Sequence, residues 1–272
     1  MRQFELDYAL MVRTVLLGGE IRHCRNGVTF SKFAQVLNIL DVGSNIPLIQ
    51  GRQMFFRGVF GEFAAFVRGP KHLSDFEQFG CNYWKQWAAE DGSLELDYGN
   101  AWLEGGQIDH VVNCLNRNPN DRRMLITGWK PDRLPSLSLP CCHYAYQFYV
   151  RHGKEGKSYI DILWHQRSTD LMVGLPSDII LAYLWLVALC KATTLDKYTP
   201  GNIYMTLGDT HIYQEHKAGA EEYIKWAFNH SGVRPVFVYD VPQGTPVTAF
   251  DPSKCKVLDY VHLSTIKFEV KA

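Results

Sequence analysis

Apolar residues along the chain follow two periodicities, one typical of helices and one typical of strands. Helical spacing is found near 3–18, 53–68, 107–117, 176–193 and 214–229. Strand-like runs are found near 28–40, 123–129, 143–151, 157–166, 202–207, 234–239 and 255–260. Because helices and strands are intermixed, the pattern predicts an α/β or α+β fold with a mixed sheet. We find no repeat, low-complexity tract or Pro/Ser-rich linker, so a single domain over 1–272 is expected.

The charges of the chain are balanced, so its own surface is neither strongly basic nor strongly acidic overall. The chain carries 28 Lys and Arg against 28 Asp and Glu, so no overall field attracts nucleic acid or a membrane. Any anion site must therefore be a local cluster of cations. From the sequence we expect no apolar run of membrane-spanning length, and the start, MRQFELDYALMVRTVLL, lacks a signal-peptide layout. Seven cysteines, an odd number, do not indicate a disulfide framework, so we expect a reducing cytoplasmic location.

The stretch GLPSDIILAY at 174–183 places an acid, Asp178, where a long apolar run begins. An ionised carboxylate is costly to bury without a partner. One interpretation is a helix N-cap or first-turn acid, which would meet free N–H groups and the helix dipole. The other is a functional carboxylate. The spacing alone leaves both open.

The stretch LPCCHYAYQFYV at 139–150 places Cys142 and His143 at the entrance of a buried strand. A thiolate there would be a nucleophile if a nearby cation lowered its pKa, although free cysteines also serve as small core residues. His143 is no evidence of a Cys–His pair, because neighbours on a strand point to opposite faces. The spacing of Cys141, Cys142 and His143 does not fit a zinc site, and we predict no metal.

Two polar stretches supply complementary groups. HQRSTD at 165–170 contains Arg167, Ser168 and Asp170, and GDTHIYQEH at 208–216 places His211 and Tyr213 on one side of an extended segment. Each alone is typical of a polar loop. Together they offer a cation, hydroxyls and an imidazole, which suit a phosphorylated sugar.

In this order the stretches resemble thymidylate synthase and the related nucleotide C5-methylases and hydroxymethylases. The similarity runs nearly end to end, from Arg25 to TIK at 265–267. Three motifs carry it: Pro140, Cys142-His143 and Gln147–Val150; Arg167, Ser168, Asp170 and Gly174–Pro176; Gly208, Asp209, His211 and Tyr213. The resemblance implies a thymidylate synthase-like three-layer fold, with a large mixed β-sheet flanked by helices.

The resemblance also implies the roles of individual residues. The catalytic group would be Cys142, Glu62, Tyr98, His143 and Asp178, with Cys142 adding to C6 of a pyrimidine and Glu62 assisting proton transfers through water. The nucleotide would be bound by Arg25, Arg122, Arg123, Arg167, Ser168, Gln147, Asp178, His211 and Tyr213. The loop RNGVTF at 25–30 is one residue shorter than the family's phosphate loop. Converging arginines would also favour the Cys142 thiolate.

The family's partners are implied in the same way. PNDRR at 119–123 resembles the paired arginines that reach the phosphate of the partner subunit, which implies a homodimer with shared sites. The co-substrate would be 5,10-methylenetetrahydrofolate, leaving as tetrahydrofolate or dihydrofolate. Its contacts would come from Arg52, Trp84, Trp87, Asp170, Gly174, Ser177 and Ala272. No nucleic acid or membrane partner is expected.

Asp178 separates this chain from the thymidylate synthases, in which the matching residue is normally Asn. An Asn amide donates to O4 of uracil and accepts from N3–H. Cytosine presents the inverse pattern, and a carboxyl group accepts from its 4-amino group. The cytidylate hydroxymethylases of the family carry Asp at this place. The resemblance thus favours a deoxycytidylate-modifying enzyme.

The product is the harder prediction. Hydride from tetrahydrofolate would give a methyl group, and water would give a hydroxymethyl group. Trp84, Trp87 and Tyr98 match the synthase pattern and favour hydride. Ser177, Ala272 and HLS at 262–264 make a looser, more polar lid and favour water. We predict a dCMP 5-hydroxymethyltransferase, in the host cytoplasm for a phage-encoded member. The alternatives are a dCMP methyltransferase, a synthase acting on dUMP, and a non-catalytic nucleotide- or RNA-binding relative.

Overall fold

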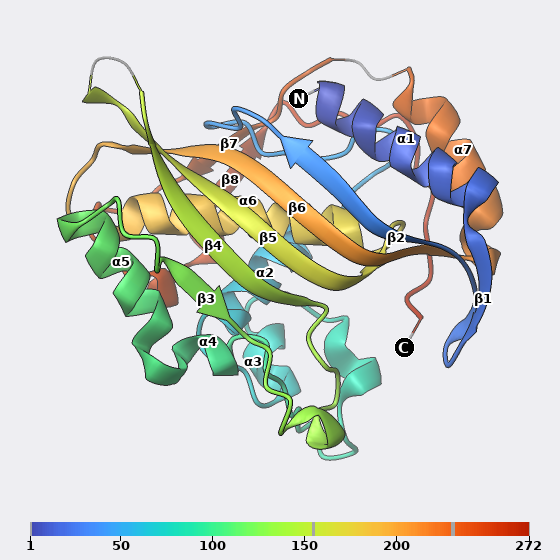
Figure 1. The fold of residues 1–272 in the computed structure, drawn as a ribbon, viewed down its shortest axis with the longest axis horizontal. Coiled ribbons are helices and arrows are strands. Elements are labelled where there is room, and N and C mark those ends of the chain that lie inside the picture. Colours follow the sequence, from blue (N-terminus) through green and yellow to red (C-terminus); the bar gives the residue numbers. More distant parts are fainter. Residues whose placement is uncertain (1, 154–155, 230–231, 272) are drawn as a thin grey trace.

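The computed structural model describes residues 2–153, 156–229 and 232–271. Its main feature is a six-stranded sheet in the order β1-β2-β6-β5-β4-β3. The strands are β1 (Glu20–Cys24), β2 (Gly27–Ile39), β3 (Leu125–Thr127), β4 (His143–His152), β5 (Ser158–Asp170) and β6 (Tyr198–Tyr213). A separate hairpin pairs β7 (Val236–Tyr239) with β8 (Cys255–Leu258). The large mixed sheet flanked by helices agrees with the predicted fold class (Figure 1).

The pairing of β5 with β6 places two of the sequence motifs side by side. These strands are parallel, whereas the other neighbours in the sheet are antiparallel. Parallel strands need a crossover, and α6 (Gly174–Ala192) supplies it behind the sheet (Figure 1). The register pairs Ser168 with Asp209 and Asp170 with His211.

The remaining helices surround this core. They are α1 (Arg2–Gly18), α2 (Phe56–Phe66), α3 (Leu73–Glu77), α4 (Asn100–Leu103), α5 (Gln107–Arg117) and α7 (Lys217–Ala227). Helix α2 packs against α6, and α1 packs against α7 and β2. In Figure 1 the opposite face of the sheet is turned toward the viewer, with no helix drawn in front of its central strands.

Helix α6 is the central helix of the core. The helix is 19 residues long, and its most apolar 18-residue segment has a mean hydropathy of 1.6, so by length and composition it could cross a membrane, contrary to the sequence-based expectation. However, 89% of this apolar segment is buried inside the molecule. Its apolar character therefore reflects burial on all sides, between the sheet and α2.

All the predicted helices and strands are present, and the differences lie in strand length and in short elements. Strand β5 continues to Asp170, so HQRSTD is extended strand rather than loop. Strand β6 spans 16 residues, well beyond the predicted 202–207. The pattern gave no sign of β1, because all five of its residues are exposed and no apolar alternation marks it.

Candidate active site

The motif residues meet at one cavity of about 460 Å³, at the end of the sheet where α6 begins. Fifteen of the predicted site residues line it: Arg25, Glu62, Trp84, Trp87, Tyr98, Cys142, His143, Arg167, Ser168, Asp170, Gly174, Ser177, Asp178, His211 and Tyr213. Val270 and Lys271, from the C-terminal tail, lie on the same wall. Residues more than 200 positions apart thus form one concave site, as small-molecule sites usually require.

Cys142 lies at the start of β4, held by contacts to its backbone. Its N–H donates to the Tyr98 hydroxyl at 2.6 Å. The Arg167 guanidinium donates to the carbonyls of Cys141 and Pro140, both at 2.9 Å, and thereby lies beside the thiol. Burial raises the pKa of the Cys142 thiol and Arg167 opposes the rise. The expected thiolate-favouring field is therefore outweighed by burial within this chain.

Glu62 lies on α2 and points into the cavity. Its Oε1 accepts a hydrogen bond from the Trp84 indole at 2.8 Å. Burial raises the pKa of Glu62 to about 7. A carboxyl group that titrates near neutrality can both accept and return a proton, which is what general acid–base catalysis requires.

Asp178 makes no helix cap. Helix α6 begins at Gly174, and the N–H groups of Met172 and Val173 before it donate to Asp170, at 2.8 and 3.1 Å. Asp178 instead accepts from Nε2 of Gln166 at 2.7 Å. Burial raises the pKa of Asp178 to about 8. The capping interpretation is therefore wrong, and at neutral pH the cavity contains a protonated carboxyl group.

His143 is a buried, neutral residue that does not pair with the thiol. Its Nδ1 makes a short hydrogen bond with the Tyr146 hydroxyl. Its Nε2 lies 3.8 Å from Oδ1 of Asp178. Burial lowers the pKa of His143 to about 3, so the imidazole stays uncharged near neutral pH.

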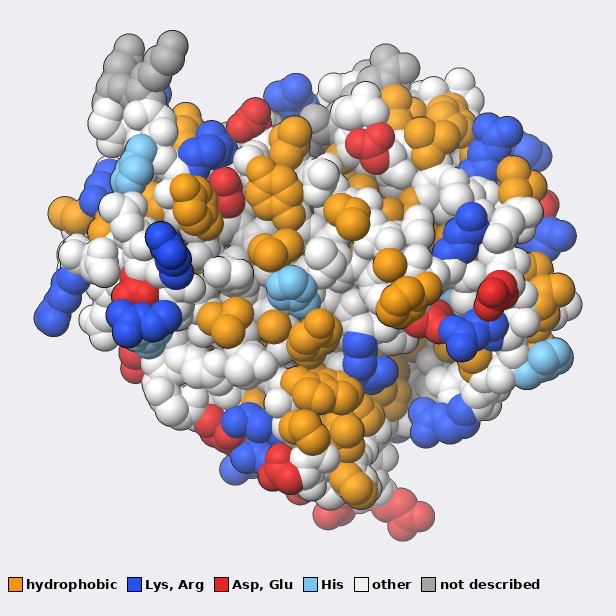
Figure 2. Space-filling view, viewed as in Figure 1, with side chains coloured by type: hydrophobic (Ala, Val, Ile, Leu, Met, Phe, Trp, Pro, Cys, Tyr) orange, Lys and Arg blue, Asp and Glu red, His pale blue; other side chains and the backbone are white. Residues whose placement is uncertain are grey.

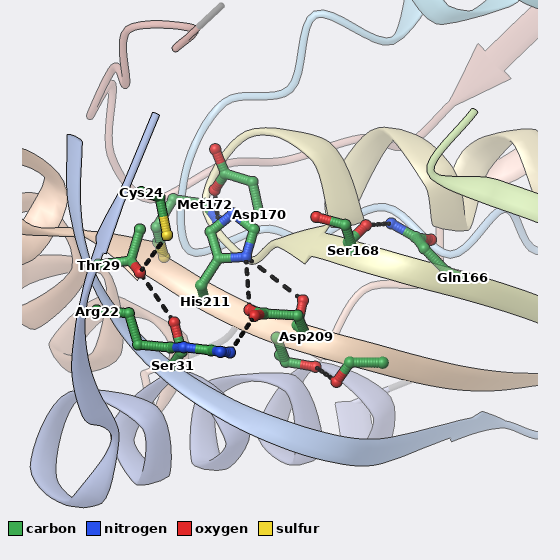
Figure 3. A network of polar contacts seen from close by, with 12 residues as sticks. Arg22, Cys24, Thr29, Ser31, Gln166, Ser168, Asp170, Met172, Asp209 and His211 are labelled. Carbon is green, nitrogen blue, oxygen red and sulfur yellow. Dashed lines mark hydrogen bonds and ion pairs between the residues drawn. The ribbon is translucent and has the colours of Figure 1, made fainter. Parts of the chain in front are cut away.

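The other end of the cavity is polar and more open. His211 faces Asp209, with Nδ1 3.2 Å from Oδ1, and Arg22 bonds the same carboxylate at 2.7 Å (Figure 3). Because a carboxylate only accepts, Nδ1 is the donor in this contact, and in a neutral imidazole Nε2 is then the acceptor that suits a sugar hydroxyl. Arg25 lies at the rim, where its Nε bonds Asn26 at 2.9 Å.

Four of the predicted residues that the structure describes do not line the cavity. Arg52 is buried, with Nη2 bonded to the Met172 carbonyl at 2.5 Å and its guanidinium 5.2 Å from the centre of the Phe268 ring. Its placement does not support the predicted direct folate contact. Ala272 lies outside the described residues.

The other three lie elsewhere on the sheet and its loops. Gln147 alternates with buried Tyr146 on β4 and so lies on the opposite face. Arg122 and Arg123 precede β3, and neither belongs to this chain's cavity. Arg123 makes a bidentate pair with Asp121, at 2.9 and 2.6 Å.

One cavity wall is aromatic and apolar. Trp84 and Trp87 lie with ring centres 5.0 Å apart. Leu139, Val173 and Val270 also line the cavity. Such a surface fits a flat ring system of the pterin type. Among the described residues, no group of three or more His, Cys, Asp and Glu side chains could hold a metal ion.

Sequence reasoning missed Gln166, the residue that bonds Asp178. It lies within the quoted HQRSTD stretch, directly before Arg167, which was singled out. Once β5 is read as a strand, Gln166 and Ser168 share one face. The alternation of side chains along the strand could have identified Gln166, but the interpretation of HQRSTD as a loop concealed it.

A comparison with protein families agrees with this geometry. The chain matches the family model described as thymidylate synthase over residues 6–272. The protein therefore belongs to the thymidylate synthase family. Membership supports a folate-dependent transfer of a one-carbon unit to C5 of a pyrimidine nucleotide, with methylenetetrahydrofolate as the family's co-substrate.

Proposed function

We propose that this protein is a deoxycytidylate 5-hydroxymethyltransferase. The observation that carries the proposal is Asp178, a buried carboxyl group in the same cavity as Cys142. Because its pKa is raised to about 8, it holds a proton at neutral pH. A neutral carboxyl group offers one donor and one acceptor. Cytosine needs that pair, a donor for N3 and an acceptor for its amino group.

The chain's own residues perform the remaining steps. Cys142 attacks C6, and the proton given by Asp178 to N3 helps the ring accept the electron pair. Glu62 takes up and returns protons near C5, for which its pKa of about 7 is suited. Arg167 and Arg25 bind the phosphate, and His211 accepts from the sugar hydroxyl. Methylenetetrahydrofolate, bound against the tryptophan wall, would supply the one-carbon unit.

Hydroxymethylation requires water at the new exocyclic carbon. Ser177 lines the cavity, and so does Lys271 of the C-terminal tail. These polar side chains favour entry of water. The tryptophan wall favours a dry site, and it supports the second candidate, methylation of dCMP by hydride with release of dihydrofolate. A third candidate, a synthase acting on dUMP, would need Asp178 to read uracil.

We also propose a homodimer that closes through the open face of the sheet. Large apolar side chains are exposed on its strands, including Phe33 at 78%, Val36 at 60% and Tyr149 at 67%. Hydrophobic and uncharged atoms occupy the middle of this face in Figure 2. Exposed apolar surface of this kind is typical of an interface. The dimer would bring the partner's Arg122 and Arg123 to the phosphate, and we place the enzyme in the cytoplasm.

Product analysis tests the proposal. Purified protein is incubated with methylenetetrahydrofolate and either dCMP or dUMP, and the nucleotide is identified by mass spectrometry while absorbance follows dihydrofolate. We expect dCMP to gain a hydroxymethyl mass without dihydrofolate. A methyl mass with dihydrofolate would make the enzyme a methylase. Preference for dUMP would overturn the proposed reading of cytosine, and no turnover would favour the non-catalytic alternative.

A further inference from the structure

Tyr83 brings a hydroxyl group to the wall of the catalytic cavity that the steps of the reaction do not use. The residue lies directly before the short helix η1 (Trp84–Trp87) and lines the cavity together with Glu62. Its hydroxyl oxygen is buried and has no hydrogen-bond partner among the described residues. A buried polar group without a partner is costly, so its presence in a reactive site points to a role in the chemistry.

A glycine on α2 lets the Tyr83 ring approach the catalytic carboxyl group. Gly58 and Glu62 are four residues apart on this helix, so they share one face. A Cβ atom at position 58 would lie 3.2 Å from Cε1 of the Tyr83 ring, closer than ordinary van der Waals contact. The ring therefore packs against the bare helix backbone one turn before Glu62.

The best acceptor for the Tyr83 hydroxyl is the ionised form of Glu62. Burial, and then the charge of Glu62, raise the pKa of Tyr83 well above its usual value, so the phenol keeps its proton. Burial raises the pKa of Glu62, and Trp84 and Tyr83 both oppose that rise, which places two donors beside the carboxylate. Trp84 already bonds Oε1 at 2.8 Å. Cys81, the other neighbour of the hydroxyl, is a poor acceptor, because burial raises the pKa of its thiol and keeps it neutral.

We propose that Tyr83 is a positioning residue that keeps Glu62 available as the base for the last step, the addition of water. In this step the water oxygen bonds the exocyclic carbon, the π electron pair of the methylene group moves into the ring, and the ring expels the Cys142 thiolate from C6. The proton of the water passes to Glu62. Hydride transfer needs no base at this carbon, so Tyr83 favours the hydroxymethyl product. The inference rests on the proposed function for the identity of the product, whereas the proximity of Tyr83 to Glu62 does not.

The test is Tyr83→Phe, studied in the full chain with dCMP and methylenetetrahydrofolate. The variant keeps the ring and removes the donor, so the pKa of Glu62 should rise and the acid limb of kcat should move to higher pH by about one unit. At pH 7 the base would then be ionised in about a tenth of the molecules instead of about half. Both products share the earlier steps, so the ratio of hydroxymethyl product to dihydrofolate should fall by about fivefold.

A matched control separates the lost hydroxyl from its surroundings. Tyr239, on β7, is also buried but lies outside the cavity, where its hydroxyl accepts from the Asp251 N–H at 3.2 Å. Tyr239→Phe should change neither the acid limb nor the product ratio. The other titratable groups around Glu62 are present in both variants: Cys81 before η1, Tyr98, Cys142 and His143 in the cavity, and Asp178 on α6.

The outcomes keep this inference apart from the proposed function. If wild type forms only the methyl product, the proposed function fails, yet a shifted acid limb in Tyr83→Phe still supports the pairing of Tyr83 with Glu62. If wild type forms the hydroxymethyl product and Tyr83→Phe leaves the ratio unchanged, the function stands and the inference is wrong. Thermal unfolding at pH 5, where Glu62 is protonated, should show no loss of stability in Tyr83→Phe. A Tm lowered by about 5 °C or more, or failure to fold, would mean that the hydroxyl is structural and would overturn the inference.

Discussion

The two ends of the cavity are built in different ways. At the base end, Asp178, Gln166 and Trp164 are 8%, 3% and 0% exposed, and buried neutral groups fix their hydrogen bonds. At the phosphate end, the Arg22–Asp209 pair that orients His211 has side chains 52% and 32% exposed. Burial makes a hydrogen bond costly to leave unmade, whereas exposed ion pairs contribute little. We therefore expect the base end to determine the selectivity between dCMP and dUMP. Changes at the phosphate end should alter only the affinity for the nucleotide.

The largest effect is expected from Cys142→Ser. Loss of the nucleophile should lower turnover by about 10³-fold or more. Nucleotide affinity, supplied mostly by the phosphate end, should stay within about threefold, since that end is untouched. Isothermal titration and steady-state kinetics measure the two quantities. Cys141→Ser is the matched control, because among the described residues its thiol bonds the Gly128 carbonyl alone and should be dispensable. Undiminished turnover in Cys142→Ser would refute the nucleophile.

Removing a cation that the partner subunit supplies should weaken the binding of the phosphate and leave the base end unaffected. We expect Arg123→Ala to lower kcat/KM by about 10²-fold, because charge-assisted bonds to a phosphate are strong. Mixing this variant with Cys142→Ser should restore activity at about a quarter of the sites if the subunits exchange and share their sites. Absence of recovery, with subunit exchange confirmed, would contradict the shared site.

The burial of Asp178 should appear in the pH dependence of stability. Its pKa is raised from 3.8 to about 8, so the folded chain retains a proton that the unfolded chain releases in this interval. The free energy of unfolding should therefore fall as pH rises from about 4 to 8. Asp178→Asn removes this cost. Its free energy of unfolding, taken relative to that of wild type, should therefore rise from pH 5 to pH 8 by an amount on the order of a few kcal/mol.

Urea unfolding of both proteins at pH 5 and at pH 8 measures this change in relative stability. Glu62 stays in both proteins, so its own raised pKa cancels in the difference. Asp121→Asn is the control, because Arg123 holds the pKa of that carboxyl group below its usual range and no gain is expected. An equal difference at pH 5 and 8 for Asp178→Asn would mean that the carboxyl group is ionised in the folded protein.

The smallest effect is expected at the exposed ion pair between Arg22 and Asp209. Arg22→Gln should raise the KM for the nucleotide by about two- to fourfold, because His211 keeps Asp209 but loses the cation that orders it. Selectivity between dCMP and dUMP should not change. A shift in selectivity of about tenfold would erase the distinction between the two ends.

The sequence predicted most of the fold, because strong periodicity marks the long elements. Helix α6 and strand β2 were placed to within a few residues. The exposed strand β1 carries no apolar alternation and was missed. In the site, short motifs identified Cys142, Arg167 and His211.

The contacts that give those residues their properties could not be predicted. Gln166 meets Asp178 only because β5 and α6 pack together, a tertiary arrangement that no local pattern encodes. The pKa of Cys142 was expected to be low from its cations, but burial outweighs Arg167. Burial is a property of the whole fold, and spacing along the chain does not report it.

Direct competition between dCMP and dUMP, in wild type and in Asp178→Asn, tests the central claim that Asp178 reads the base. Both nucleotides are supplied at equal concentration with methylenetetrahydrofolate, and mass spectrometry follows the two products. We predict that wild type consumes dCMP and that Asp178→Asn reverses the preference by about 10²-fold or more, since an Asn amide donates to O4 of uracil and accepts from N3–H, whereas a carboxyl group can accept from the 4-amino group of cytosine. An unchanged preference in the variant would contradict the account.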